Sequence, residues 1–332
     1  MATLTRNTLA AALAATIAVG VPAWIRAAEA PVPVQIVDVL NQRFGVHPGF
    51  RANHAKGIVA EGSFKASPEA ASLSRSPLFI GTKLPVTVRF SDSGGLPDAP
   101  DASPVANPHG MAIKFHLPGG GESDIVVNAL KFFPVATPED FLNLQRAAAT
   151  SPLGAPPSPQ LKAFLASHPS VAKANATVGT PASFAEEQYF GVDAFVFADK
   201  AGKKHPFRYI VAPENVVHLS NEEAAKKSPD YLMSDLPARL AKGPVTFHLK
   251  AQLAAAGDPT RDPSQPWPDD RPVVDLGVLT IERVAADSAT AEKKLLFLPG
   301  RLTDGIEPSD DPLIAARDAA YAVSFGRRSA KP

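Results

Sequence analysis

Two residues near the end of the chain, Arg317 and Tyr321, are spaced so that they can act together. Four residues make about one turn of an α-helix, so both side chains would lie on one helical face. A phenol titrates at about pH 10 and binds a cation as phenolate only where a positive charge favours the ionised form. Arginine supplies that charge because it keeps its proton. The spacing is therefore typical of a tyrosine prepared to bind a metal through its oxygen.

Helical periodicity extends this face in both directions. One stripe of the projected helix carries Ile314, Arg317, Tyr321, Ser324 and Arg328, with Gly326 expected to end the helix. Two guanidinium groups would then lie beside the phenolate, where a dianionic cofactor bound through iron would use both. Considered singly, the same residues also fit a solvated charge and a half-buried aromatic ring.

A second group of polar residues surrounds His54, which stands just before a predicted strand that begins at Gly57. In the next predicted strand, residues 85–91, side chains alternate between two faces. Arg89 and Ser91 share one face with Thr87, and the apolar residues occupy the other. His54 would thus lie close to an arginine and a hydroxyl, although a strand-end histidine without a chemical role fits the same pattern.

Further strands follow at short intervals. Residues 110–117 place Met111, Ile113, Phe115 and Leu117 on one face, and residues 124–130 form the next predicted strand after a glycine turn. Later strand-like segments cover residues 189–211, 245–253 and 273–284. This pattern predicts an antiparallel sheet or barrel.

Helices are predicted between and after these strands. Thr137 before Pro138 and Ser158 before Pro159 are typical N-caps, and Ser309 is expected to cap the last helix. Strands, helices, strands and a final helix make an α+β fold. No segment has the length and polarity of a domain linker, so residues 31–332 are predicted to form a single domain.

Composition excludes several classes of function. Lys+Arg and Asp+Glu both count 33, so no basic surplus exists to bind nucleic acid. The chain has no cysteine, which rules out disulfides and thiolate ligands. Dinucleotide, P-loop, zincin and α/β-hydrolase motifs are absent from the sequence, and no two histidines are spaced to chelate zinc from one helix.

The first 30 residues differ from the rest of the chain. Arg6 precedes an apolar run from Leu9 to Ile25, and Ala28-Glu29-Ala30 has the pattern of a cleavage site. We interpret residues 1–30 as a signal peptide, which predicts a periplasmic or secreted protein. An uncleaved membrane anchor is the alternative, since the apolar run reaches the lower limit for spanning a bilayer.

Several short motifs occur in an order that is similar to one known family. They are Arg51–Gly57, Gly62–Phe64, Val88–Ser91, Gly110–Phe115, Asp124–Asn128, Trp267–Pro268, and Gly305–Ser309 followed by Arg317 and Tyr321. Together they resemble the haem catalase family over roughly residues 35 to 328. The closer resemblance is to its small, exported catalase-related peroxidases.

The resemblance implies a haem b held by an eight-stranded antiparallel β-barrel with flanking helices. Tyrosine is the proximal haem ligand of catalases, and Tyr321 matches it, with Arg317 beside its oxygen. His54 and Asn128 match the catalytic residues of the distal side. The other implied cofactor contacts are Arg51, Arg89 and Arg328 to the propionates, Ser91 to His54, and Phe133 and Phe141 as pocket walls.

The chain also departs from the family pattern. Gly191-Val192-Asp193-Ala194-Phe195 stands where the family carries Gly-Ser-His-Thr-Phe, so a polar histidine is missing. The sequence ends at residue 332, 11 residues after Tyr321, so we expect no C-terminal helical domain and no nicotinamide site. A monomer or small homo-oligomer is expected in place of an interlocked tetramer.

The resemblance implies a haem peroxidase that reduces hydrogen peroxide and organic hydroperoxides with an organic electron donor and has weak catalase activity. A true catalase is the alternative within the family. An exported haem-binding protein without turnover and a lipocalin-like barrel for an apolar ligand are the alternatives outside it. The expected partners are a hydroperoxide and a small organic reductant, with no nucleic acid and no membrane beyond the possible anchor.

Overall fold

The computed structural model describes residues 29–330, and residues 31–330 belong to one compact unit. The predicted signal peptide lies outside the described residues except for its last two positions, so its prediction stands as made. Among residues 29–330, no helix combines the length and the apolar character needed to cross a bilayer.

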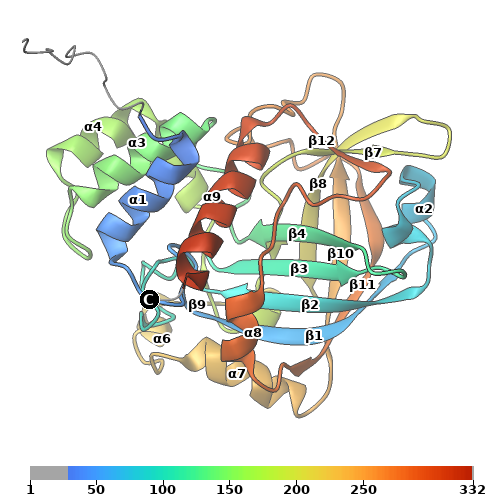
Figure 1. The fold of residues 1–332 in the computed structure, drawn as a ribbon, viewed down its shortest axis with the longest axis horizontal. Helices are drawn as coiled ribbons and strands as arrows, with labels where there is room; N and C mark the ends of the chain where they lie inside the picture. The colour runs from blue at the N-terminus through green and yellow to red at the C-terminus, as the bar shows by residue number, and fades with distance from the viewer. Residues whose placement is uncertain (1–28, 331–332) are drawn as a thin grey trace, which may run out of the picture. The chain divides into compact units, whose positions relative to one another are not determined.

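Eight antiparallel strands of this unit close into a barrel, as the sequence predicted (Figure 1). The barrel closes because β8 pairs with β6 and β7 on one edge and with β10 on the other. In order around the barrel, the strands are β10 (Val245–Leu253), β11 (Val273–Val284), β1 (Gly57–Ala66), β2 (Lys83–Ser91), β3 (Gly110–His116), β4 (Glu122–Asn128), β6 (Tyr189–Phe190) and β8 (Lys204–Pro213).

Shorter strands extend this sheet or pair outside it. Strand β7 (Phe195–Ala198) pairs with β8, and β12 (Ile306–Pro308) pairs with β7. Strands β5 (Thr180–Pro181) and β9 (His218–Leu219) form a separate pair. The pairing of β12 with β7 matters for the site, because it brings the residues before the last helix next to the β6–β7 loop.

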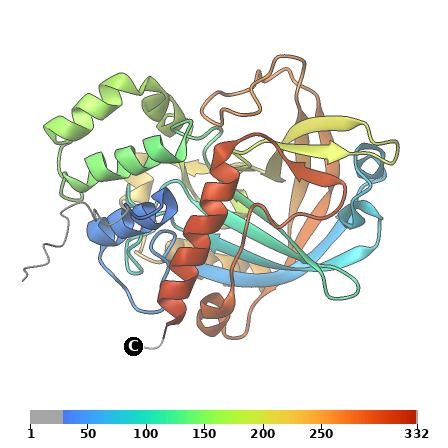
Figure 2. The same ribbon diagram turned by 45° about the horizontal axis from the view of Figure 1, so that its top comes forward.

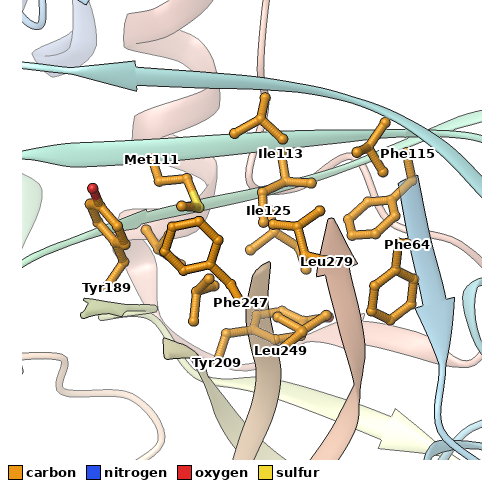
Figure 3. Close-up of a cluster of buried hydrophobic side chains, with 14 of the residues drawn as sticks. Phe64, Met111, Ile113, Phe115, Ile125, Tyr189, Tyr209, Phe247, Leu249 and Leu279 are labelled. Atoms are coloured by element: carbon orange, nitrogen blue, oxygen red, sulfur yellow. The ribbon is translucent and has the colours of Figure 1, made fainter. Parts of the chain in front are cut away.

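Apolar side chains fill the barrel interior (Figure 3). On β2, the predicted inward residues Val86, Val88 and Phe90 belong to this core. Phe90 packs in turn against Phe247 of β10, with ring centroids 6.1 Å apart. Because alternate residues of a strand point to opposite faces, the polar residues of β2 lie on the outside of the barrel.

Three helices pack against one another beside the barrel (Figures 1 and 2), with α1 in contact with both of the others. They are α1 (Val32–Phe44), α3 (Pro138–Ala149) and α9 (Pro312–Ser329). The remaining helices are α2 (Ala70–Leu73), α4 (Pro159–Ser167), α5 (Pro169–Asn175), α6 (Asn221–Ala224), α7 (Tyr231–Leu240) and α8 (Ser288–Lys294), with 3₁₀ turns at Pro77–Phe79 and Phe184–Glu186.

The predicted caps of α3 and α4 are confirmed. The hydroxyl of Thr137 accepts a hydrogen bond from the Asp140 amide, and that of Ser158 accepts one from the Leu161 amide, both at 3.1 Å. Each cap is followed by a proline at the first helical position, where the missing N–H costs nothing.

The predicted bounds of the last helix are wrong at both ends. Helix α9 begins at Pro312 with Asp311 as its N-cap, because Ser309 donates its hydroxyl to Thr260 O at 3.0 Å and lies beyond β12. Gly326 lies within the helix, which continues to Ser329. The last turn is held by Arg327, which pairs with Asp38 at 2.7 Å, and by Arg328, which donates to Leu295 O at 2.6 Å.

Candidate functional site

One pocket lies between the outer face of β2–β4 and the helices α1, α3 and α9. With its open mouth it encloses an empty volume of about 1270 Å³. All ten site residues chosen from the sequence line it, namely Arg51, His54, Arg89, Ser91, Asn128, Phe133, Phe141, Arg317, Tyr321 and Arg328. The pocket is outside the barrel, whose interior is filled by the apolar core.

The strand wall of the pocket is built from small residues. Across the sheet, Gly110 of β3 lies between Ser91 and Asn128, and Ala112 lies between Arg89 and Val126. At these two positions β3 carries no side chain larger than a methyl group on this face, so this part of the wall is open and flat. Such a surface can take a planar ligand.

His54 is held against this wall in an unusual backbone conformation. Its φ is +56°, a left-handed value that residues other than glycine seldom adopt. Its Nδ1 lies 3.0 Å from Ser91 Oγ. A Cβ at Gly110 would stand 3.1 Å from the imidazole Cε1, so the glycine makes room for the ring. The backbone strain and the missing side chain together fix the position of the imidazole.

The surroundings of His54 keep its ring neutral. Burial, and then the charge of Arg89, lower the pKa of His54 to about 3. When its proton is on Nδ1 and donated to Ser91, Nε2 carries a lone pair. His54 can therefore accept a proton from a ligand in the pocket at neutral pH.

Asn128 lies at the end of β4 and presents an amide to the same pocket. Its Oδ1 accepts a hydrogen bond from the Leu130 amide at 2.9 Å. This bond ends the strand at Asn128, two residues before the predicted end at Leu130. It also fixes the amide so that its N–H donors are left for a ligand.

Tyr321 and Arg317 form the predicted pair on α9. Arg317 Nε and Nη2 each donate to the Tyr321 oxygen at 3.2 Å. Arg317 Nη1 forms an ion pair with Asp193, which is 1% exposed. Burial alone would lower the pKa of Arg317, but Asp193 and Tyr321 outweigh it and raise that pKa. The guanidinium is therefore permanently charged beside the tyrosine oxygen.

The rest of the predicted stripe on α9 is confirmed in part. Ser324 lines the pocket with Tyr321, and its hydroxyl accepts a hydrogen bond from the Ala52 amide at 3.2 Å. The helix that carries the tyrosine is thus tied to the segment that carries His54. Ile314 does not line the pocket, because it is buried in the main apolar cluster.

Three guanidinium groups converge at one end of the pocket. Glu292 of α8 pairs with Arg51 at 3.2 Å and with Arg89 at 3.1 Å. Leu295 O accepts from Arg51 at 3.1 Å and from Arg328 at 2.6 Å. Burial, and then the charge of Arg89, lower the pKa of both Arg51 and Arg328, the latter to about 10.

The positive charge of the three guanidinium groups is only partly balanced by nearby carboxylates. One carboxylate, Glu292, pairs with two of them, and within residues 29–330 the buried Nε atoms of Arg89 and Arg328 have no hydrogen-bond partner. Unpaired buried donors are costly. This end of the pocket is therefore suited to a ligand that carries negative charge, such as a dicarboxylate.

Apolar side chains line the remainder of the pocket. Phe133 and Phe141, both predicted, stand with ring centroids 5.4 Å apart. Ile36, Val37 and Leu40 of α1 complete the wall.

Sequence reasoning missed α1 as a wall and missed Glu292. Both follow from tertiary packing, and Glu292 resembles an ordinary solvated helix charge in the sequence. Asp193 was noticed as a departure from the family pattern, but its contact with Arg317 was not predicted.

Known proteins are similar to this chain over most of its length. The sequence matches the catalase family profile over residues 48–330. It is 35% identical over 305 residues to a catalase-related peroxidase of Mycolicibacterium paratuberculosis, with 90% of this chain and 95% of the relative covered. It is 34% identical over 327 residues to a catalase-related peroxidase of Synechococcus elongatus, with 97% and 96% covered.

Solved catalases share the fold. A fungal catalase superposes with a TM-score of 0.75 at 24% identity, covering 85% of this chain and 60% of the other. Catalase A from Saccharomyces cerevisiae gives a TM-score of 0.75 at 22% identity, covering 85% and 62%. The chain therefore spans about 60% of the length of these solved catalases.

Proposed function

The chain belongs to the catalase family, and from this premise we propose that it is a haem-dependent peroxidase that reduces hydroperoxides with an organic electron donor. The family and its two peroxidase relatives make it an oxidoreductase of the catalase and peroxidase class. One observation carries the finer proposal. A single pocket holds an arginine-paired tyrosine oxygen together with a neutral histidine and an oriented amide.

The residues of the pocket fit a haem b. Tyr321 would bind the iron as phenolate, which Arg317 favours through its charge. The flat wall along β3 suits a planar ring. The two propionates would meet Arg51, Arg89 and Arg328, whose charge the lone Glu292 does not balance.

When bound, haem iron supplies the redox chemistry that cleavage of a peroxide O–O bond requires. The protein supplies proton transfer and orientation. His54 would take the proton from one peroxide oxygen and return it to the leaving oxygen, acting first as base and then as acid. Asn128 would donate a hydrogen bond that orients the peroxide, and Ser91 would keep the imidazole in position.

A peroxidase is favoured over a true catalase by the walls of the pocket. Ile36, Val37 and Leu40 of α1, with Phe133 and Phe141, give the pocket an apolar side that suits an organic hydroperoxide. Weak catalase activity is expected as well. The predicted signal peptide supports a periplasmic or secreted enzyme.

The test is made on one preparation of the full chain expressed with ample hemin. Its absorbance spectrum is recorded before and after peroxide, and oxygen release is compared with oxidation of a phenolic dye. We expect a Soret band and faster dye oxidation than oxygen release. Vigorous oxygen release without dye turnover would favour a true catalase, and a colourless protein would end the haem assignment.

A haem carrier without turnover is the second candidate within this proposal. His54 and Asn128 argue against it, because capture of haem needs no acid–base residue. A Soret band that does not respond to hydroperoxides would favour the carrier.

A further inference from the structure

Glu292 of α8 is a largely buried carboxylate that reaches the pocket through two arginines. Its side chain is 12% exposed, and Glu292 is not among the residues that line the pocket. One of its oxygens, Oε2, accepts from Arg89 Nη2 at 3.1 Å and from Arg51 Nη1 at 3.2 Å. Hydrogen bonds between ionised groups are strong and directional. Glu292 therefore decides where both guanidinium groups lie.

The Arg89 guanidinium also holds the backbone of His54. The same Nη2 atom that contacts Glu292 donates to the His54 carbonyl oxygen at 2.9 Å, with a longer contact of 3.5 Å to Ala55 O. This nitrogen carries two hydrogens, so Glu292 and the His54 carbonyl can each accept one. Gly57 leaves room for the contact, because a Cβ there would stand 2.4 Å from Arg89 Nη2. One nitrogen atom thus joins Glu292 to the backbone of His54.

The backbone of His54 needs this support. Its left-handed φ of +56° is unfavourable for a residue with a side chain. Its amide donates to Ser93 O at 2.5 Å, and its ring lies 3.0 Å from Ser91 Oγ. The carbonyl is held by the charged donor Arg89. Loss of that donor would let His54 relax toward an ordinary φ, and the ring would then move away from Ser91.

Repulsion between arginines makes the carboxylate necessary. After burial, the charge of Arg89 is the largest effect that lowers the pKa of Arg51 and of Arg328. Among the described residues, Glu292 is the only carboxylate that pairs with Arg51 or Arg89. Without it the two guanidinium groups would repel each other, and Arg89 could turn into the open pocket and leave the His54 carbonyl.

Helix α8 is anchored on the barrel, so Glu292 is a fixed point. The Ser288 hydroxyl at the start of the helix accepts from the Val59 amide of β1 at 2.8 Å. The carbonyl oxygen of Leu295, just after the helix, accepts from Arg51 at 3.1 Å. Both ends of α8 are therefore tied to elements that surround His54.

We propose that Glu292 is a positioning residue for His54. Its carboxylate keeps Arg89 where Nη2 donates to the His54 carbonyl, and this contact fixes the imidazole against Ser91 without any contact between Glu292 and a peroxide. The consequence for the reaction rests on the proposed function, whereas the position of the ring in the haem-free chain does not.

The position of the ring is tested on the full chain without haem, labelled with nitrogen-15 at histidine. The ring signals of His54 are those missing from His54→Gln. At neutral pH the ring is uncharged, because its pKa is about 3, and it should show the single tautomer fixed by Ser91. Glu292→Asp keeps the charge but is one methylene too short to hold both arginines. It should release the ring, whose nitrogen signals should move to the average of two tautomers.

The consequence for the reaction is tested on the haem-loaded chain. Glu292→Asp should slow the peroxide-induced change of the Soret band by roughly tenfold to a hundredfold, because a small displacement of the base is enough for such a loss. Its haem content should match the wild type, since the charge near the propionates is unchanged. Lys294→Gln alters an exposed charge on the same helix. This control should match the wild type in haem content, in rate and in the His54 signals.

Glu292→Gln separates positioning from charge. It keeps the length of the side chain and an acceptor oxygen for Arg89, so it should slow the reaction less than Glu292→Asp does. It should bind haem at least as tightly as the wild type, because three guanidinium groups then face two propionates without a competing carboxylate. A role through charge alone predicts the opposite order, with Glu292→Asp normal and Glu292→Gln slowed, and that order would overturn the inference.

The remaining outcomes separate this inference from the proposed function. Unchanged His54 signals in Glu292→Asp would refute the positioning role, even in a chain that binds haem and reacts with peroxide. Signals that respond to Glu292→Asp in a chain that binds no haem would refute the proposed function and leave the positioning role standing. If Glu292→Asp does not fold, the isosteric Glu292→Gln decides: its His54 signals should move part of the way, and no movement would refute the role.

Discussion

The phenol oxygen of Tyr321 accepts its hydrogen bonds from a charged group. Arg317 donates two hydrogen bonds to it, each 3.2 Å long. Since this oxygen is the proposed iron ligand, Tyr321→Phe should lower haem affinity by about tenfold or more. Haem content after purification, and hemin titration of the haem-free chain, measure the change. Tyr231→Phe is the control, because that hydroxyl donates to Pro181 O at 2.7 Å away from the pocket; equal haem binding by both variants would remove the ligand assignment.

His54 should control the reaction with peroxide without controlling haem content. Its pKa of about 3 keeps the imidazole neutral, so the wild-type rate should hold down to about pH 4. His54→Gln removes the base and should slow the peroxide-induced change of the Soret band by about a hundredfold or more. Stopped-flow absorbance gives this rate. His116→Gln is the control and should react normally, because His116 lies on the same sheet and is hydrogen-bonded to Thr87 at 2.9 Å. An equal loss of rate in this variant would mean that the effect of His54→Gln comes from a general disturbance of the fold.

At the scale of elements, strand β3 makes room for the imidazole of His54 because it has no side chain at Gly110. A Cβ at Gly110 would lie 3.1 Å from His54 Cε1 and 3.2 Å from Ser91 Oγ. Gly110→Ala should displace the imidazole and reduce peroxide turnover by roughly tenfold to a hundredfold. Haem content should fall less than turnover does, because the propionate contacts and the tyrosine are elsewhere. Normal turnover in this variant would show that the ring moves without cost.

Helix α9 contains a glycine that serves as a comparison for Gly110. Gly326 lies inside the helix, and a Cβ built there meets no atom within 4 Å. Glycine in a helix interior is less favourable than alanine, so Gly326→Ala should stabilise the protein by about 0.5–1 kcal/mol. Urea unfolding of the haem-free chain measures the gain, and peroxide turnover should not change. A loss of stability would mean that the last turn is not helical in solution.

The strands could be predicted because alternation of apolar and polar residues records directly which face is buried. It placed Val86, Val88 and Phe90 inward and Arg89 and Ser91 toward the pocket. The start of α9 was predicted at the wrong cap, since two residues that can cap a helix, Ser309 and Asp311, stand two positions apart. Pro308-Ser309 and Asp311-Pro312 both satisfy the local rules, and only the pairing of β12 with β7 selects the second.

The site could be predicted where a motif carries it and not where packing assembles it. All ten residues chosen from the sequence line the pocket. No short sequence motif marks Glu292 or the α1 side chains as part of the site. Glu292 reaches it through Arg51, which is more than 200 residues away along the chain. Asp193 stood out only as a missing histidine, and its ion pair with Arg317 joins two elements that are far apart along the chain.

At the scale of the whole molecule, the buried neutral histidine of the site makes the free energy of unfolding depend on pH. A histidine whose pKa is lowered by folding binds fewer protons in the folded chain than in the unfolded chain. For His54 the folded pKa is about 3, against an ordinary value of 6.5. Between these pH values His54 is protonated in the unfolded chain and neutral in the folded chain. Stability is therefore complete above about pH 6.5 and falls as the pH falls toward 3.

His54→Gln should relieve this loss. One unit of pKa corresponds to about 1.4 kcal/mol, so at pH 5 the neutral imidazole should cost the wild-type chain about 2 kcal/mol relative to pH 7. Urea unfolding of the haem-free wild type and variant at both values of pH measures the difference. Asp311 acts in the opposite direction, because its folded pKa of about 7 lies above the ordinary carboxyl value and its contribution is lost as the pH rises. It is present in both proteins and cancels in the comparison, so a pH dependence that is identical in the two would show that His54 is not buried as a neutral base.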